Sequence, residues 1–362
     1  MLQKKQKICL VSDCLALGGA EKVAADLSFF FDKNGFEVHH IIVQNKIEYL
    51  FAGQLLNLGK LKNQSNNILN KLERLIVFNN FIKNQNFDYI IDFRVKNSFW
   101  QELAISKFIY QTKTIYAIHS FMLDLYFPKN KHLATLIFKN KSIIAISTTI
   151  KSSIGAAFNL KNVAVIHNLI DLQFIKKNSE IPCNISYDYI VLAGTFNNNK
   201  QFDKIIECYS KSILPSKNIK LILLGNGENK LNLEKLVEQL DLKDKVIFKG
   251  RVQNPYTYYA RAKFLVLASK FEGLPMVLIE CLACGTPVIS FDCKSGPNEI
   301  INNNNNGLLV ENQNFEELTM AINKLIDDTE LYAKCKSNAA PSIEKFDLHN
   351  IGQQWLDFLK TL

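Results

Sequence analysis

The chain has 362 residues, of which 48% are hydrophobic and 21% are charged, and it carries a formal net charge of +9. This length and composition fit two globular domains of about 150 to 200 residues each, and they exclude a disordered protein. No apolar run reaches the roughly 18 to 20 residues that span a bilayer, and the start MLQKKQKICLVSDC turns polar too early for a signal peptide, so we expect neither a leader nor a membrane anchor.

Strand-length apolar segments alternate with helix-length segments along the whole chain, which is typical of repeated βα units in a parallel sheet. In the first half, strands are predicted at residues 7–12, 37–43, 88–93, 113–118, 142–147 and 162–166. The second half repeats the pattern at 187–194, 219–225, 245–250, 263–269, 286–291 and 307–310. The polar stretch 171–186 is predicted to be the linker, and the asparagine run 302–306 a solvated loop.

These elements predict an α/β protein with two Rossmann-like, doubly wound parallel sheets. We expect an N-terminal domain over residues 1–170 and a C-terminal domain over 171–362, whose last helix is free to pack back on the first domain. Two such sheets facing each other would form a central cleft at the carboxyl ends of their strands, where open α/β sheets bind ligands.

The eight cysteines are scattered through apolar segments, so we interpret them as reduced core residues of a cytoplasmic protein. Cys281 and Cys284 form a C-x-x-C inside a predicted helix, and no second Cys or His pair completes a tetrahedral site. The sequence D-x-D is also absent. We therefore expect no metal and no other cofactor.

The densest signal is the segment SKFEGLPMVLIECLACGTPVIS. A strand ends before it, Pro275 stands where a helix would begin, and Gly285 stands where that helix would stop. Free N–H groups at such a helix start suit a diphosphate. Glu272 would accept hydrogen bonds from hydroxyls just before the helix, and Glu280 would reach a ribose two turns later.

At these residues the chain resembles the retaining glycosyltransferases of family four, which have the GT-B fold and the signature E-x7-E within EGxPxxxxEAxAxGxPVI. Cys281 replaces the usual Ala. The resemblance implies that Glu272 contacts the donor sugar and Glu280 the ribose hydroxyls of a nucleotide. It also implies that the intervening residues Gly273, Leu274, Pro275, Met276 and Val277 line the donor site.

Further motifs carry the same resemblance. Gly18 and Gly19 belong to a GGAE loop, which in the family lies against the donor phosphates and the transferred sugar. His119 follows a predicted strand and corresponds to a histidine near the sugar, most plausibly as a hydrogen-bond donor to a hydroxyl. VIHNLIDLQF resembles the interdomain stretch VIxNGID, keeping Asn168 and Asp171.

The donor diphosphate is expected at LAGTFNNNKQF, which resembles GRxxxxKG. The resemblance implies that Gly194, Thr195 and Lys200 bind the donor, with Lys200 facing the phosphates. Thr195 replaces the family arginine, so half of the positive clamp is missing. Arg94 and Arg251 are candidates for additional charge, and Gly225 with Asn226 resembles the family's GxGP loop at the donor.

The prediction of the acceptor depends on net charge and on one basic, partly apolar segment. The positive charge allows nucleic acid, an anionic membrane surface or an anionic substrate, but no zinc-finger spacing, RNP-like signature or long arginine tract favours nucleic acid. The segment PKNKHLATLIFKNK (128–141) mixes lysines with an apolar patch. It is either a peripheral membrane contact or an amphipathic helix packed on the first domain with a solvated basic edge.

We therefore predict a hexosyltransferase that moves a hexose or N-acetylhexosamine, with retention, from a nucleotide diphosphate sugar, in particular a UDP sugar. The predicted acceptor is a glycan, in particular a lipid-linked one, in surface polysaccharide or glycan biosynthesis. Two alternatives stay open: a nucleotide-sugar 2-epimerase of the same fold, and a non-catalytic nucleotide-sugar-binding protein, which the missing arginine at Thr195 favours.

Overall fold

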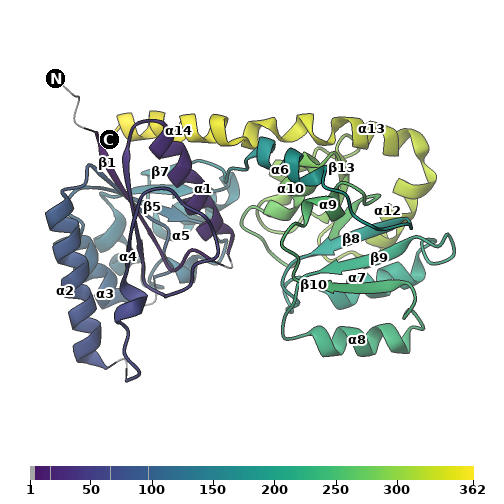
Figure 1. Ribbon diagram of the computed structural model, residues 1–362, viewed down its shortest axis with the longest axis horizontal. Helices are drawn as coiled ribbons and strands as arrows, with labels where there is room; N and C mark the ends of the chain where they lie inside the picture. The colour runs from purple at the N-terminus through teal and green to yellow at the C-terminus, as the bar shows by residue number, and fades with distance from the viewer. Residues whose placement is uncertain (1–4, 17, 66, 97) are drawn as a thin grey trace. The chain divides into compact units, whose positions relative to one another are not determined.

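The computed structural model describes residues 5–16, 18–65, 67–96 and 98–362. The chain forms two compact units. In Figure 1 the first is coloured from purple to teal, with its C-terminal helix in yellow, and the second runs from teal to yellow. The first unit consists of Met1–Leu169 together with Leu348–Leu362, and the second of Ile170–Asp347.

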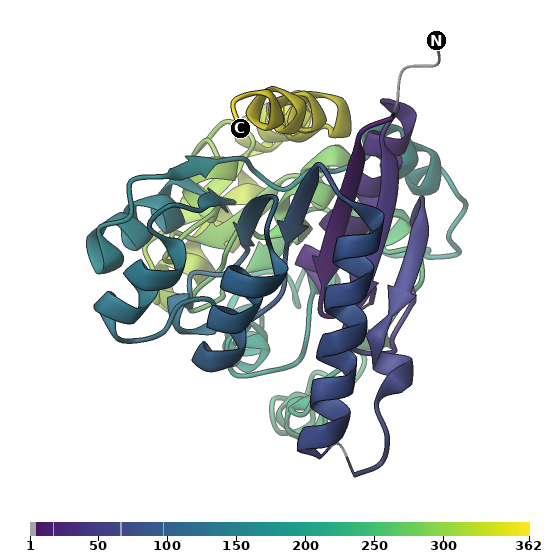
Figure 2. The ribbon, with the colours of Figure 1, turned by 90° about the vertical axis from the view of Figure 1, so that its left-hand side faces the viewer.

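The first unit is built on a parallel sheet of seven strands in the order β3-β2-β1-β4-β5-β6-β7. The strands are β1 (Lys7–Ser12), β2 (Glu37–Ile42), β3 (Gln54–Asn57), β4 (Tyr89–Asp92), β5 (Lys113–Ile118), β6 (Ser142–Ala145) and β7 (Val163–Val165). The helices are α1 (Gly19–Lys33), α2 (Ile68–Gln85), α3 (Phe99–Ala104), α4 (Lys131–Phe138), α5 (Thr148–Phe158) and α14 (Leu348–Lys360), with short turns η1 (Leu58–Leu61), η2 (Ile105–Ile109) and η3 (Leu123–Leu125). Figure 2 shows α2 beside η1 in front of this sheet.

The C-terminal helix α14 completes the core of the first unit. Its side chains Ile351, Trp355 and Leu359 are buried in the same cluster as Phe30 and Phe31 of α1. A Cβ on Gly352 would lie 2.4 Å from the ring of Phe30, so the glycine lets the two helices approach closely. Figure 1 shows α14 in yellow running over α1.

The second unit is built on a parallel sheet of six strands in the order β10-β9-β8-β11-β12-β13. The strands are β8 (Tyr189–Ala193), β9 (Lys220–Leu224), β10 (Val246–Gly250), β11 (Leu265–Leu267), β12 (Val288–Phe291) and β13 (Gly307–Val310). The helices are α6 (Leu172–Ser179), α7 (Phe202–Lys211), α8 (Lys230–Gln239), α9 (Tyr256–Tyr259), α10 (Met276–Ala283), α11 (Pro297–Ile300), α12 (Phe315–Asp327) and α13 (Thr329–Ala339), followed by the turn η4 (Pro341–Phe346).

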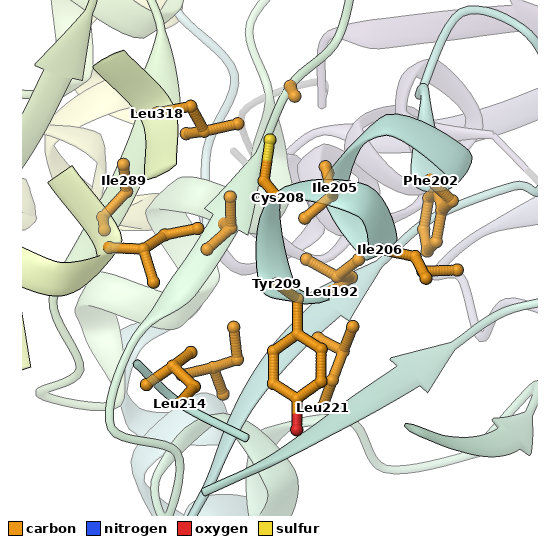
Figure 3. Close-up of a cluster of buried hydrophobic side chains, with 14 of the residues drawn as sticks. Leu192, Phe202, Ile205, Ile206, Cys208, Tyr209, Leu214, Leu221, Ile289 and Leu318 are labelled. Carbon is orange, nitrogen blue, oxygen red and sulfur yellow. The ribbon is translucent and has the colours of Figure 1, made fainter. Parts of the chain in front are cut away.

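The core of this unit lies where α7 packs on the sheet (Figure 3). Helical spacing places Ile205, Ile206 and Tyr209 among Leu192 and Leu221 of the strands. The Tyr209 ring is fully buried, and its hydroxyl donates a hydrogen bond to the carbonyl of Ile219 at 2.8 Å. The polar end of this side chain is therefore satisfied inside an otherwise apolar core.

The predicted fold class and the twelve predicted strands are confirmed, with strand ends differing by at most three residues. Three local predictions differ from the structure. The edge strand β3 was not predicted. The supposed linker contains α6, because Asp171 caps it by accepting the N–H of Phe174 at 2.8 Å. The loop 302–306 is not wholly solvated, since buried Asn306 donates to the carbonyl of Ile300 and the hydroxyl of Ser342.

Candidate active site

The residues predicted for the donor gather at the carboxyl edge of the second sheet. Strand order reverses between β8 and β11, which are neighbours in the sheet. Loops that leave two such strands turn to opposite faces and open a crevice, which is where doubly wound sheets bind ligands. Lys200 lies on the loop after β8, and Glu272 lies on the loop after β11.

Lys200 and Glu272 form an ion pair at this switch point. The ammonium Nζ lies 2.5 Å from Oε1 of Glu272, and the two side chains are only 18% and 12% exposed. The Lys200 stem passes Gly194, where a Cβ would lie 3.5 Å from Cε. Burial, together with the charge of Glu272, raises the pKa of the neighbouring Cys293 to about 12, so this thiol stays protonated.

Two asparagines that the sequence analysis did not select hold this pair in place. Asn197 Oδ1 accepts the N–H groups of Asn199 and Lys200, both at 3.1 Å. The amide of Asn199 pairs with the backbone of Phe271, next to Glu272. In the sequence, FNNNK looks like a polar turn, and only the pairing of distant loops shows its role.

A third loop supports Glu272 from the side of α11. The N–H of Glu272 donates to the carbonyl of Lys294 at 3.2 Å, and Ser295 Oγ donates to the carbonyl of Gly273 at 2.7 Å. Gly296 has φ +99°, and a Cβ there would lie 2.6 Å from Cδ of Pro275. Only glycine fits this close approach without strain.

Helix α10 begins directly after the loop that carries Glu272. Its first residue is Met276, and no side chain caps it; the N–H of Leu278 donates to the carbonyl of Pro275 at 3.0 Å, while a helix start of this kind suits an anionic ligand. Leu274 and Pro275 are buried, while Val277 is half-buried. Glu280 is half-buried one turn further along the helix, and burial followed by the charge of this carboxylate raises the pKa of Cys284 to about 12.

The loop after β9 meets the loop after β8. Phe196 donates its N–H to the carbonyl of Asn226 at 3.0 Å. Gly225 has φ +136°, and a Cβ there would lie 1.9 Å from the carbonyl oxygen of Gly194. Thr195 is exposed. Arg251 belongs to the same edge, since Gly225 donates its N–H to the carbonyl of Gly250 at 2.8 Å.

The first unit has its own switch point, between β1 and β4. Gly18 is the N-cap of α1, Gly19 is its first residue, and the carboxylate of Glu21 folds back over Gly18. Asp13, which the sequence analysis did not select, follows β1 and accepts the N–H of Val95 at 2.9 Å. Burial raises the pKa of both Asp13 and Glu21.

His119 follows β5 at the same edge of the first sheet. Its ring packs against Phe93, with centroids 5.4 Å apart, and burial lowers its pKa to about 3. The imidazole is therefore neutral rather than cationic at physiological pH. Within the described residues, Nδ1 has no hydrogen-bond partner.

Arg94 forms a buried ion network and does not offer free charge. Its guanidinium binds Asp92 at 2.7 Å and Glu102 at 3.1 Å, and the residue is 4% exposed. Burial opposes ionisation of Asp92, but Arg94 and Lys96 outweigh it and hold the pKa of Asp92 at about 2. We therefore leave Arg94 out of the donor site.

Asn168 and Asp171 fall in different units. Asn168 is buried in the first unit, and its Oδ1 has no hydrogen-bond partner in the described part of the chain. Asp171 belongs to the second unit, where it caps α6.

The described ranges 5–16, 18–65, 67–96 and 98–362 hold neither a metal cluster nor a membrane-spanning helix. Nowhere in these ranges do three or more His, Cys, Asp or Glu side chains come together in a way that could hold a metal ion. Among the helices of the same ranges, none combines the length and the apolarity needed to cross a membrane.

Residues 175–341 match the family described as glycosyl transferases group 1. A curated relative from Campylobacter jejuni, N-acetylgalactosamine-N,N'-diacetylbacillosaminyl-diphospho-undecaprenol 4-alpha-N-acetylgalactosaminyltransferase, is 27% identical over 98% of this chain and 99% of the relative. The amylovoran biosynthesis glycosyltransferase AmsD of Erwinia amylovora is 23% identical over 94% of this chain and 96% of its own length.

Among solved structures, Anabaena Alr3699/HepE in complex with UDP has a TM-score of 0.77 at 21% identity, covering 99% of this chain and all of that one. At this identity the likeness establishes the fold. The protein is a glycosyltransferase of the GT-B fold, and its second unit carries the domain of the group 1 glycosyl transferases.

Proposed function

We propose that the protein transfers a hexose or N-acetylhexosamine from a UDP sugar to a lipid-linked glycan, with retention of configuration, in surface polysaccharide or glycan biosynthesis. The observation that carries the donor half is the Lys200–Glu272 pair at the switch point of the second sheet. The bound UDP of the Anabaena structure supports the choice of nucleotide. The diphospho-undecaprenol in the name of the Campylobacter relative supports the acceptor class.

In this proposal the second unit neutralises and orients the donor. Lys200 exchanges its contact with Glu272 for the β-phosphate, and the uncapped start of α10 binds phosphate oxygens. Glu272 then accepts hydrogen bonds from the sugar hydroxyls, and Glu280 from the ribose. Arg251 adds positive charge in place of the arginine that Thr195 replaces.

In the first unit, the loop at Gly18 and Gly19 and the neutral imidazole of His119 contact the transferred sugar. The acceptor oxygen bonds to the anomeric carbon on the face from which the diphosphate leaves. The acceptor proton passes to the departing phosphate oxygen, so no side chain has to act as a nucleophile. The products are the glycosylated acceptor and the nucleoside diphosphate.

The proposed acceptor also bears on location. A lipid-linked glycan stays in the membrane, so the protein would work at the inner face of the plasma membrane, as a cytoplasmic protein bound peripherally. The donor site itself is proposed to need no metal, because Lys200 and the dipole of α10 supply the positive charge.

The test begins with a panel of nucleotide sugars, of which the true donor raises the melting midpoint. Transfer to an undecaprenyl diphosphate-linked glycan is then measured for Lys200→Ala and Glu272→Ala. We expect losses on the order of 100-fold to 1,000-fold, as for removal of one electrostatic contact to a transition state.

Lys204→Ala is the matched control, since Lys204 forms an exposed pair with Glu207 on α7. Full transfer by both site variants would contradict the proposal. Binding of the donor with no transfer and no release of nucleotide by the wild type would favour the binding-protein alternative, and conversion of the donor sugar to its epimer would favour the epimerase.

A further inference from the structure

Helix α2 of the first unit exposes a continuous apolar stripe. Ile68, Leu69, Leu72 and Ile76 are between 51% and 81% exposed. Their spacing of three and four residues places them along one side of the helix. The helix packs through other residues, the buried Asn70, Phe78 and Ile82.

The elements beside α2 also expose apolar side chains. Leu61 at the end of η1 is 40% exposed, and η1 contacts α2. Trp100 of α3 and Phe108 of η2 are at least 70% exposed, and η2 also contacts α2. Figures 1 and 2 both show α3 alongside α2, and in both views the N-terminal end of α2 reaches beyond α3. Single exposed apolar side chains are ordinary, but a gathered set marks an interaction surface.

Basic residues surround the apolar stripe. The segment 60–76 holds four basic residues, Lys60, Lys62, Lys71 and Arg74, against one carboxylate, Glu73. The three lysines are exposed. Phe108 follows the exposed Lys107. Apolar side chains flanked by lysines, with an exposed tryptophan, are the pattern of a surface that lies in the interface of an anionic bilayer.

The segment 128–141, which the sequence offered as a membrane contact, fits this role less well. In α4, Ala134, Ile137 and Phe138 are buried in the first unit. Leu136 is its large apolar side chain that remains exposed. The second interpretation of that segment, a helix packed on its own domain, is the one the structure supports.

We propose that the apolar stripe of α2 docks the protein on an anionic phospholipid surface. This inference rests on the proposed function, since a lipid-linked acceptor is what would bring the enzyme to a bilayer. The occupant is the lipid interface itself: Ile68, Leu69, Leu72 and Ile76 enter the acyl boundary while Lys60, Lys62 and Lys71 contact phosphates.

The test is flotation of the full chain with vesicles of phosphatidylcholine alone, or of phosphatidylcholine mixed with phosphatidylglycerol. We expect the wild type to float with the anionic vesicles and to be released by high salt, which screens the lysines. The double variant Leu69→Gln, Leu72→Gln should bind these vesicles at least about tenfold more weakly, because two exposed leucines no longer transfer from water. These residues are exposed, so folding should not change.

The double variant Leu231→Gln, Met320→Gln removes two exposed apolar side chains of the second unit and is the matched control. The increase in melting midpoint on adding UDP should be the same in all three proteins, so failure of the docking surface can be told from failure of the donor site. Unchanged flotation of the α2 variant would overturn the proposal. A dimer in light scattering that the α2 variant dissociates would also overturn it, by assigning the stripe to a second copy of the chain.

Discussion

The side-chain amide of Asn199 pairs with the backbone of Phe271 through both of its ends. Nδ2 donates to the carbonyl at 3.1 Å, and Oδ1 accepts the N–H at 3.3 Å. The carbonyl of Asn199 also accepts the N–H of Lys270 at 2.9 Å. Two loops separated by about seventy residues are thus joined next to the residues that form the Lys200–Glu272 pair.

Replacing Asn199 by Ala should therefore lower the transfer rate without removing a group that touches the donor. Loss of two partly buried hydrogen bonds should destabilise the second unit by about 1 to 3 kcal/mol. We expect kcat to fall roughly tenfold or more, since small displacements of catalytic groups are costly, while UDP still binds. The neighbouring exposed Asn198→Ala is the control, and equal kcat values for the two variants would argue against a positioning role.

Gly225→Ala should destabilise the second unit strongly. The new Cβ would overlap the carbonyl oxygen of Gly194, and φ is +136°. The added strain should amount to about 3 kcal/mol or more. Gly285→Ala separates steric overlap from backbone strain, because Gly285 has φ +76° but nothing within 4 Å of an added Cβ. This variant should lower the free energy of unfolding by only about 1 kcal/mol. Calorimetric melting of the two variants measures this difference, and equal shifts would contradict the steric argument.

Buried histidines should make the first unit sensitive to acid. Burial lowers the pKa of His119 to about 3 and that of His40 to about 4, below the ordinary 6.5. The unfolded chain therefore binds protons first as the pH falls below 6.5, and stability is lost toward pH 3. At pH 5 the cost for His119 is about 2 kcal/mol.

Unfolding by denaturant at pH 7 and pH 5 measures this cost. His119→Asn should lose less stability between the two pH values than the wild type, while His40 keeps its share in both. His132→Asn, at an exposed site on α4, should behave like the wild type. A His119 variant that is as acid-sensitive as the wild type would show that another group titrates.

Arg94→Met should destabilise the first unit by about 3 to 5 kcal/mol, because the buried Glu102 would lose the guanidinium and Asp92 would keep only Lys96 and Tyr110. Lys129→Met breaks an exposed pair with Asp124 and should change stability by less than about 1 kcal/mol. Melting curves compare the two, and UDP titration should give the same affinity for folded Arg94→Met as for the wild type. A large loss of UDP affinity at full stability would return Arg94 to the donor site.

Local sequence was enough to predict each βα unit whose signal lies within a few residues. Apolar segments predicted every strand except β3, and Pro275 and Gly285 marked the limits of α10, because caps and periodicity are properties of neighbouring residues. The short edge strand β3 escaped since only half of it is apolar and none of it is buried. Asp171 is a capping residue that the sequence shows, although the polar residues after it favour a linker.

By itself the sequence determined the α/β class and the candidates Glu272, Glu280 and Lys200, since these depend on residue types at fixed spacing. Only the tertiary structure decided that Lys200 and Glu272 form an ion pair and that Asn199 joins their loops. It also decided that Arg94 pairs with two buried carboxylates. It also decided which amphipathic helix keeps its apolar side exposed, α2 rather than α4. The physical reason is the same in each case: contacts between distant segments, and the burial of one face of a helix, depend on how strands are ordered in the sheet, which local spacing does not encode.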